Sequence, residues 1–479
     1  MKVTVKQLIL LLIPFFSLAS LVMVLVESSR LPEGYGLLWL LPVVYGAFTL
    51  CFYSKIINTD YPIATVLYFG MQFLRMVIMP ATIALAGEAS ASVFSFVTAE
   101  HLHLAIIMIL IEFLIVGLFV VVKAGQKIKN KREGLPILAG AKEVYILLGI
   151  FAVLVYAYFK FARNIDLVYF FTIPIGAEER VGDLTDTFLV LARRIVTMAI
   201  SFLFLYLVDR YRQKETLLPN KRNLSMPLLA AVLSVCIIVG ERRSAQVYTA
   251  FMCCYILMLA FENQKGKILR WVCGAAVLVF VLMSVYKQFA GFLYDSYGEA
   301  IQNSSMSIGE FSNTLQSYFA GPQNVALAMG FAENVSLDPW QLFFDFVRST
   351  FPISMFVKGG GDVTSVLMNN YIYFGTQDTG HVLTATSYGY VFGGILLFFW
   401  PMILNVVFIF WAERAMRCCR SYEWLWIWLS ILLRFALSFT ANPPALLISA
   451  TMTLVIDGLV VWAATLVKRS MLKGKSGEI

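Results

Sequence analysis

Two pairs of adjacent arginines stand where an anion would be bound. Arg193-Arg194 and Arg242-Arg243 lie toward the outer ends of apolar segments, whereas the main basic clusters lie on the other side of the membrane. The guanidinium group is permanently charged, and its planar fork of donors matches phosphate oxygens. Several such groups at one membrane depth would hold a pyrophosphate headgroup. The alternatives are pairing with nearby Glu241 or no binding role.

His381 stands alone at the expected mouth of a membrane span, where a near-neutral imidazole could take a proton from a sugar hydroxyl. A structural role for this side chain is the alternative. His101 and His103 are two residues apart, do not share a helix face and make a poor metal pair. The sequence has no Asp-x-Asp pair, no Walker A motif and no metal-spaced cluster of Cys and His. It therefore predicts neither a nucleotide-sugar donor nor a metal, and no other cofactor.

The elements that must position these residues are membrane-spanning helices. Hydrophobic residues make up 59% of the 479 and charged residues only 14%, which excludes a soluble globular protein. Apolar runs long enough to cross a hydrocarbon core of about 30 Å recur, and they are too long and evenly apolar for barrel strands. We expect an all-α polytopic membrane protein with about twelve spans. The expected spans are 7–26, 37–54, 61–86, 102–122, 144–161, 187–208, 226–240, 245–261, 268–290, 384–410, 424–441 and 445–467.

Basic residues give the orientation, because Lys and Arg close to span ends resist translocation. The strongest clusters lie in 123–132, 210–222, 414–420 and the tail 468–475, and alternating spans place all of them, with both termini, in the cytoplasm. The net charge of +8 then reflects topology and anionic lipid. No basic surface suited to nucleic acid is visible.

The same count places residues 291–383 outside the membrane, as one long loop between nine spans in 1–290 and three in 384–479. We expect these three parts to work as a single integral membrane domain, and a loop of this length to have short helices and a function of its own. Asp338 and Pro339 predict a helix start. The side chains that would then share one apolar face are Trp340, Phe343, Phe344, Val347 and Phe351. Such a helix would lie on the outer leaflet or re-enter it.

A polar and aromatic stretch follows in the same loop. Asn369-Asn370-Tyr371 and Tyr373 are residue types suited to sugar contacts, and an ordinary solvated loop is the alternative.

Charged side chains are also expected deep within spans. Arg75 and Arg434 are basic, and Glu112 and Asp457 are acidic. A charge near mid-membrane costs about 2.5–3.5 kcal/mol on insertion scales, so each needs a partner or a water-filled cavity. They either pair with one another across helices or give deep support to an anion site.

Three sequence motifs within 225–400 resemble a known family, the bacterial O-antigen polymerases of the Wzy type. The stretch VGERRSA (239–245), followed by an apolar helix, is similar to their Gly-x-x-Arg corner. YFAGPQN (318–324) and DFVR (345–348) are similar to the loop of enterobacterial-common-antigen and capsule repeat-unit polymerases. HVL (381–383), followed by Thr386, Tyr388 and Gly389, resembles the His-containing end of that loop in polymerases and in O-antigen ligases. Glu241 and Arg242 depart from the family pattern; either Arg242 or Arg243 is the family arginine, and we favour Arg243.

The resemblance implies metal-independent glycosyl transfer between two polyprenyl-pyrophosphate-linked oligosaccharides on the outer face of the bacterial cytoplasmic membrane. His381 would deprotonate or orient the attacking hydroxyl, and Arg243 and Arg348 would stabilise the leaving pyrophosphate. The residues expected to bind pyrophosphate or glycan are Arg194, Arg193, Arg242, Arg75, Arg434, Asn324, Tyr318 and Tyr388. The implied partners are the lipid-linked oligosaccharides, membrane lipids, a chain-length regulator and a flippase. The product would be O-antigen, capsule or exopolysaccharide.

Two other functions stay open at this point. An O-antigen ligase would move finished glycan onto a lipid or protein acceptor. A non-enzymatic flippase or transporter of lipid-linked oligosaccharides would also have many spans and intramembrane charges. The long outer loop argues against transport, because a flippase needs its polar groups in a central cavity.

Overall fold

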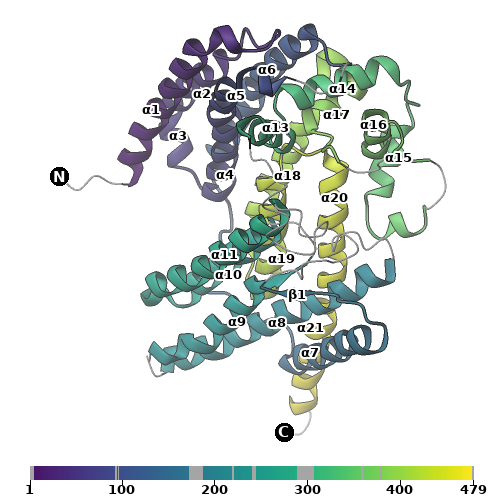
Figure 1. Cartoon of the computed structure of the whole chain (residues 1–479). Coiled ribbons are helices and arrows are strands. Elements are labelled where there is room, and N and C mark those ends of the chain that lie inside the picture. The colour runs from purple at the N-terminus through teal and green to yellow at the C-terminus, as the bar shows by residue number, and fades with distance from the viewer. Residues whose placement is uncertain are drawn as a thin grey trace. The chain divides into compact units, whose positions relative to one another are not determined.

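The computed structural model describes residues 5–91, 94, 96–171, 187–217, 221–239, 244–288, 307–357, 361–376 and 380–476. These residues are almost entirely helical, which confirms the all-α class (Figure 1). They pack into two compact units whose bounds cut across the three parts expected from the sequence. Unit 1 comprises Met1–Asn130, Met306–Ala415 and Ile431–Val455, and unit 2 comprises Lys131–Ser305, Met416–Ser430 and Ile456–Ile479.

Unit 1 combines the N-terminal helices with the short helices that follow residue 306. Its helices are α1 (Val5–Val26), α2 (Leu40–Cys51), α3 (Tyr53–Ile57), α4 (Pro62–Phe73), α5 (Met79–Ala86), α6 (Ala99–Ala124), α13 (Ile308–Tyr318), α14 (Pro322–Asn334), α15 (Gln341–Arg348), α16 (Thr364–Ile372), α17 (Ala385–Leu397), most of α18 (Trp400–Cys418), the second part of α19 (Tyr422–Leu437) and α20 (Pro443–Met452). Helix α14 packs on both α6 and α17, so the segment after residue 306 is built into the helix bundle.

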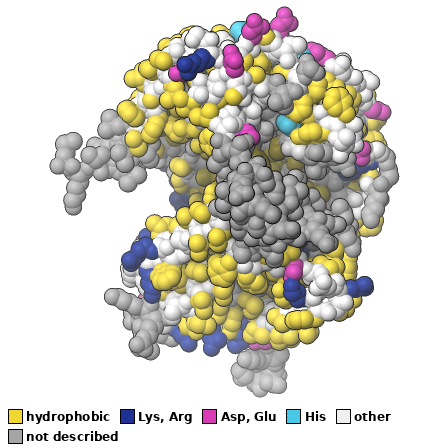
Figure 2. Space-filling model, viewed as in Figure 1, with side chains coloured by type: hydrophobic (Ala, Val, Ile, Leu, Met, Phe, Trp, Pro, Cys, Tyr) yellow, Lys and Arg dark blue, Asp and Glu magenta, His cyan; other side chains and the backbone are white. Residues whose placement is uncertain are grey.

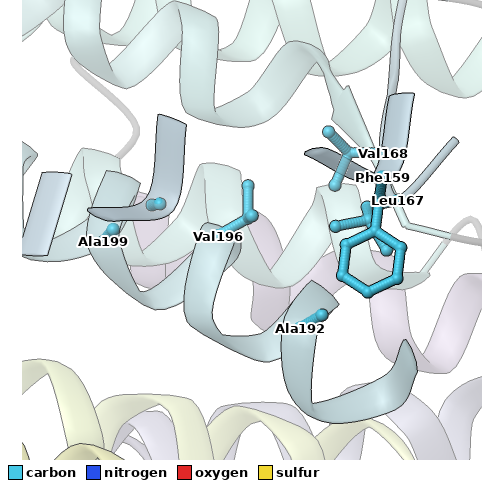
Figure 3. Packing of buried hydrophobic residues seen from close by; sticks show 7 residues of the cluster. Phe159, Leu167, Val168, Ala192, Val196 and Ala199 are labelled. Atoms are coloured by element: carbon cyan, nitrogen blue, oxygen red, sulfur yellow. The ribbon is translucent and has the colours of Figure 1, made fainter. Parts of the chain in front are cut away.

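Unit 2 contains the middle helices and the C-terminal helix. Its helices are α7 (Lys142–Ala157), α8 (Thr187–Leu217), α9 (Ser225–Cys236), α10 (Ser244–Ala260), α11 (Lys265–Gln288) and α21 (Gly458–Ser476). Two strands of two residues each, β1 (Tyr169–Phe170) and β2 (Ile237–Ile238), pair antiparallel, with Tyr169 opposite Ile238. The apolar faces of α7 and α8 meet around Phe159, Ala192 and Val196 (Figure 3).

Six helices of the described chain are long and apolar enough to cross a membrane: Pro62–Ser90, Ala99–Ala124, Lys142–Ala162, Phe188–Glu215, Glu262–Met283 and Pro443–Lys473. Apolar side chains also cover much of the drawn face of the molecule (Figure 2). Four further apolar helices are shorter: Leu12–Val26, Leu40–Cys51, Ser225–Cys236 and Ala245–Ala260. These helices agree with a membrane protein, while the number of twelve spans stays a prediction.

A bend divides the apolar run that the sequence analysis treats as one span at 384–410. Helices α17 and α18 meet there at 116°, and counting them as one span would bring the total to seven. Gly394 has φ +59°, a backbone conformation that side-chain-bearing residues rarely adopt, and this ends the regular helix. The chain then folds back so closely that a Cβ at Gly389 would overlap the carbonyl oxygen of Phe398.

Three π-helical turns interrupt or end helices in the described chain, and each carries one charged residue. They are Leu74–Ile78 with Arg75, Tyr158–Ala162 with Lys160, and Thr453–Asp457 with Asp457. Each of these residues forms an ion pair, at 2.5 Å with Glu112, 2.6 Å with Asp166 and 2.6 Å with Arg194, respectively. A π turn is a local departure from helical geometry that often marks a functional position. Here each turn coincides with a residue that forms an ion pair.

The fold-back at Gly389 gives the first prediction. Gly389→Ala should lower the thermal unfolding midpoint, because overpacking against backbone costs about 1–3 kcal/mol. The measurement is thermal unfolding of detergent-solubilised protein. Gly274→Ala in α11 is the matched control, since a Cβ there meets nothing within 4 Å, and it should be neutral or slightly stabilising. An unchanged midpoint for Gly389→Ala would contradict the fold-back.

Candidate functional site

Residues 381–384 of unit 1, which we call the histidine strap, run in extended form into the start of α17. Three asparagines hold this strap by its backbone. Asn369, Asn324 and Asn442 donate side-chain N–H groups to the carbonyl oxygens of residues 381, 382 and 383, at 3.0, 3.2 and 2.8 Å. The strap ends at Thr384, whose hydroxyl accepts the backbone N–H of Ser387 at 3.1 Å and caps α17. The carbonyl groups of residues 381, 382 and 383 are therefore each held by a different asparagine.

The three asparagines come from different helices. Asn324 lies in the first turn of α14, Asn369 lies within α16, and Asn442 is the N-cap of α20, where its side-chain oxygen accepts from the N–H of Ala445 at 2.9 Å. All three are buried. A buried amide without hydrogen-bond partners costs free energy, so moving α14, α16 or α20 away from the strap would be unfavourable. These three side chains therefore stabilise one arrangement of the helices around the strap.

His381 is half-buried and fixed by both its backbone and its ring. Its backbone N–H donates to the side-chain oxygen of Asn369 at 2.8 Å, and Nδ1 lies 2.7 Å from the hydroxyl of Tyr373. The ring of Phe94 meets the imidazole edge-on, with centroids 5.5 Å apart. Burial lowers the pKa of His381 below its ordinary 6.5, so the imidazole is neutral at physiological pH. Within the described residues Nε2 has no hydrogen-bond partner.

Arg75 forms the most deeply buried polar network of unit 1. Its guanidinium donates to Glu112 at 2.5 Å, to the carbonyl oxygen of Ala320 at 3.0 Å and to the hydroxyl of Thr386 at 3.1 Å. Thr386 in turn donates to Glu112 at 2.5 Å. Arg75 is 1% exposed and Glu112 is fully buried. The network joins the helix from α4 to α5, helix α6, the turn between α13 and α14, and α17.

A second buried carboxylate joins the helices around the strap. Asp345 on α15 accepts from the hydroxyl of Tyr388 at 2.9 Å, from the backbone N–H of Thr364 at 3.0 Å and from the amide of Gln341 at 3.1 Å. It links α15 to α16 and to α17. The hydroxyl of Tyr388, which the resemblance assigned to substrate binding, is thus bonded to a protein carboxylate.

The other predicted residues of unit 1 lie nearer the surface. Arg348, at the end of α15, is half-buried; it donates to the carbonyl oxygen of Gly361, and its guanidinium carbon lies 5.9 Å from the ring centroid of Phe344. Arg434 on α19 donates to the hydroxyl of Ser449 on α20. Tyr318, at the end of α13, has an exposed side chain.

Neither arginine pair is found among the described residues of unit 1. Arg193 and Arg194 belong to unit 2, where Arg193 donates to the carbonyl oxygen of Leu167 at 3.0 Å and Arg194 pairs with Asp457 at 2.6 Å. Arg242 and Arg243 lie outside the described residues. Unit 1 therefore brings Arg75, Asn324 and Tyr388 around the strap that carries His381.

One residue of this site, Asn442, is not singled out in the sequence analysis, and two others have a different role from the one expected. Asn442 precedes Pro443 and Pro444, a pattern typical of a helix start, and this signal predicts its capping role. The bond of its side-chain N–H to residue 383 has no local signal. Asn369 and Tyr373 fall in the stretch expected to contact sugar, and here they position His381.

Comparisons with protein-family models, with curated proteins and with solved structures find no match for this chain.

The buried ion pair gives a prediction about stability. Arg75→Met leaves the carboxylate of Glu112 buried without its cation, which typically costs about 3–5 kcal/mol. Replacing both partners, as Arg75→Met with Glu112→Leu, should recover most of that loss. The thermal unfolding midpoint in lipid nanodiscs measures both effects.

The matched control is Arg30→Met, which removes an exposed arginine from its ion pair with Glu27. An exposed pair contributes about 0–1 kcal/mol, so this change should be nearly silent. A double variant as unstable as Arg75→Met alone would show that the loss does not come from the uncompensated charge.

Proposed function

We propose that this protein is a glycosyltransferase that polymerises polyprenyl-pyrophosphate-linked oligosaccharide repeat units on the outer face of the bacterial cytoplasmic membrane. The observation that carries the proposal is the setting of His381. A neutral imidazole stands on a rigidly held strap at the start of an apolar helix, with one ring nitrogen bonded to Tyr373. The motif resemblance supplies the class of substrate.

In the proposed reaction, Nε2 of His381 accepts the proton of the acceptor hydroxyl. For Nε2 to be unprotonated, Nδ1 carries the ring hydrogen and donates it to the hydroxyl oxygen of Tyr373. The acceptor oxygen then forms a bond to the anomeric carbon of the donor glycan, and the bond from that carbon to pyrophosphate breaks. The electron pair leaves with the pyrophosphate, which gains negative charge.

Arginines stabilise that charge. Arg348 suits this role because its guanidinium is half-buried on the segment that precedes the strap, and its Nε has no partner among the described residues. Arg243 joins it by the resemblance, and Arg242 and Arg434 are the further proposed contacts. Arg193 and Arg194 instead bond the carbonyl oxygen of Leu167 and the carboxylate of Asp457 within unit 2. Arg75 acts differently, because its donors are taken up by Glu112, Ala320 and Thr386. Arg75 therefore supports the site indirectly, by holding Thr386 near the start of α17.

The proposal includes the topology with twelve spans, cytoplasmic termini and segment 291–383 outside. A glycan contact at the exposed Tyr318 belongs to it as well, as do a chain-length regulator and a flippase as partners. Asn324 and Tyr388, which are buried and bond the carbonyl of residue 382 and Asp345, position the strap and α17 in this proposal. An O-antigen ligase is the second candidate, since the motif that begins at His381 resembles the loop end of both enzymes.

The deciding experiment is reconstitution in proteoliposomes with lipid-linked repeat units and no other protein. The wild-type chain should produce a ladder of longer lipid-linked glycans, and His381→Ala should leave single repeat units, a loss of about 10²–10⁴-fold for a general base. His103→Ala, at an exposed histidine of α6, is the matched control and should keep the ladder.

Different outcomes separate the alternatives. A full ladder with His381→Ala would contradict the role of the histidine. Retained polymer length combined with lost transfer to a final acceptor would indicate a ligase. A folded wild-type chain that makes no ladder but moves lipid-linked glycan across the bilayer would indicate a transporter.

The pH dependence of polymerisation follows from the state of His381. Because burial lowers its pKa, the neutral form that accepts a proton persists at and somewhat below pH 6.5. The rate should stay high at pH 6.5 and fall only in more acidic buffer, as the imidazole becomes protonated. Initial rates measured from pH 5 to 8 would check this, and an acid limb centred above 6.5 would contradict it.

A further inference from the structure

Residues 340–356 of unit 1 expose a cluster of large hydrophobic side chains on α15 and on the short turn Ile353–Met355. We call this cluster the aromatic face. Its members are Trp340, Phe343, Phe344, Ile353, Met355 and Phe356. Trp340 is 66% and Phe356 84% exposed. Soluble surfaces rarely expose several large apolar side chains within one short segment, so the face needs an apolar neighbour.

The aromatic face lies beside a helix of membrane-spanning length. The N–H of Phe351 donates to the hydroxyl of Thr451 at 3.0 Å, and α15 packs on α20. Thr451 is eight residues into the candidate span Pro443–Lys473, which is about 12 Å along a helix axis. The segment therefore runs alongside the apolar part of that helix, which exposes Ile448.

On its other side, α15 meets the bend between α17 and α18. The ring of Phe346 lies 6.4 Å from that of Trp400, the first residue of α18. Immediately before the bend Ile395, Leu396 and Leu397 are exposed, Leu396 by 80%. The aromatic face is thus flanked by exposed apolar side chains of two helices that form candidate spans.

The back of α15 carries the opposite chemistry. Asp345 points into the protein and bonds Tyr388 on α17 and the N–H of Thr364 on α16. A contact that fixes the aromatic face in place would therefore also fix α17, which begins where the histidine strap ends. Arg348 completes the pattern as a half-buried cation at the end of α15, with its guanidinium carbon 5.9 Å from the ring centroid of Phe344.

We propose that the aromatic face inserts among the acyl chains of the outer leaflet and fixes the depth of the histidine strap in the membrane. Aromatic side chains with a nearby arginine are typical of the boundary between headgroups and acyl chains. Lipid is the occupant because the neighbouring helices α17 and α20, which belong to candidate membrane spans, also expose apolar side chains. This inference does not depend on glycosyl transfer, and its assignment to the outer leaflet rests on the topology given under the proposed function.

Collision rates of a nitroxide spin label test the insertion. In a full-length variant with the seven native cysteines replaced, Phe343→Cys and Phe356→Cys would carry the label in turn. Ser336→Cys, at an exposed polar residue just before α15, is the control. The protein is reconstituted in nanodiscs of phosphatidylethanolamine and phosphatidylglycerol, and relaxation is measured with oxygen, which concentrates in lipid, and with a water-soluble nickel chelate.

Labels at Phe343→Cys and Phe356→Cys should meet oxygen often and the nickel chelate several-fold less than the label at Ser336→Cys does. Equal access to the chelate at all three positions would place the face in water and overturn the proposal. Poor access to both reagents would show that protein covers the face, a second copy or another segment, and would overturn it equally. Neither readout requires glycan synthesis, so the proposed polymerase activity can fail without affecting this test.

Discussion

A charge that cannot reach water sets the organisation of unit 1. The guanidinium of Arg75 is buried among helices, where an unpaired cation is far costlier than at the surface, so every donor position needs an acceptor. Its acceptors lie 37, 245 and 311 positions further along the chain, on Glu112, Ala320 and Thr386. Satisfying one side chain therefore draws the N-terminal helices, the segment after residue 306 and α17 into one assembly. The π turn at Leu74–Ile78 coincides with this residue.

The histidine strap depends on that assembly. Thr386 lies five residues after His381 and is held by both members of the ion pair, while three asparagine amides hold the carbonyls between them. The backbone of His381 is held by hydrogen bonds at both its N–H and its carbonyl group, and Tyr373 bonds the imidazole ring. A catalytic group gains most when its geometry is set before the substrate arrives, because the ordering cost has already been met in folding.

The helical class and the exposed apolar side chains Trp340, Phe343 and Phe344 follow from the sequence, because both depend on neighbours within a few residues. The expected helix face extended to Phe351, but α15 ends at Arg348. The sequence also shows that Arg75, Glu112 and Asp457 need partners, but it leaves open which pairs form, since Arg194 and Asp457 are 263 positions apart. The hydrogen bonds from Asn324 and Asn442 to backbone carbonyls could not be predicted, because they join residues 58 and 59 positions apart and leave no periodic pattern in the sequence. The bend after α17 escapes prediction for another reason: residues 384–410 are continuously apolar, and glycines such as Gly394 also occur in straight membrane helices.

The proposed glycosyl transfer and the proposed lipid insertion of the aromatic face both depend on how deep His381 lies in the membrane. In the proposed reaction two lipid-linked reactants move in the plane of the membrane, and their reacting groups stand at a height set by their carriers, so the proposed base His381 would be effective only at that height. Asp345 connects the two requirements, because the same helix, α15, carries the aromatic face outward and this carboxylate inward. Three donors, from α15, α16 and α17, converge on Asp345, so α15 cannot shift relative to the strap without leaving buried polar groups unpaired. A lipid anchor at the aromatic face would thereby place His381 at the level where both carriers present their pyrophosphates.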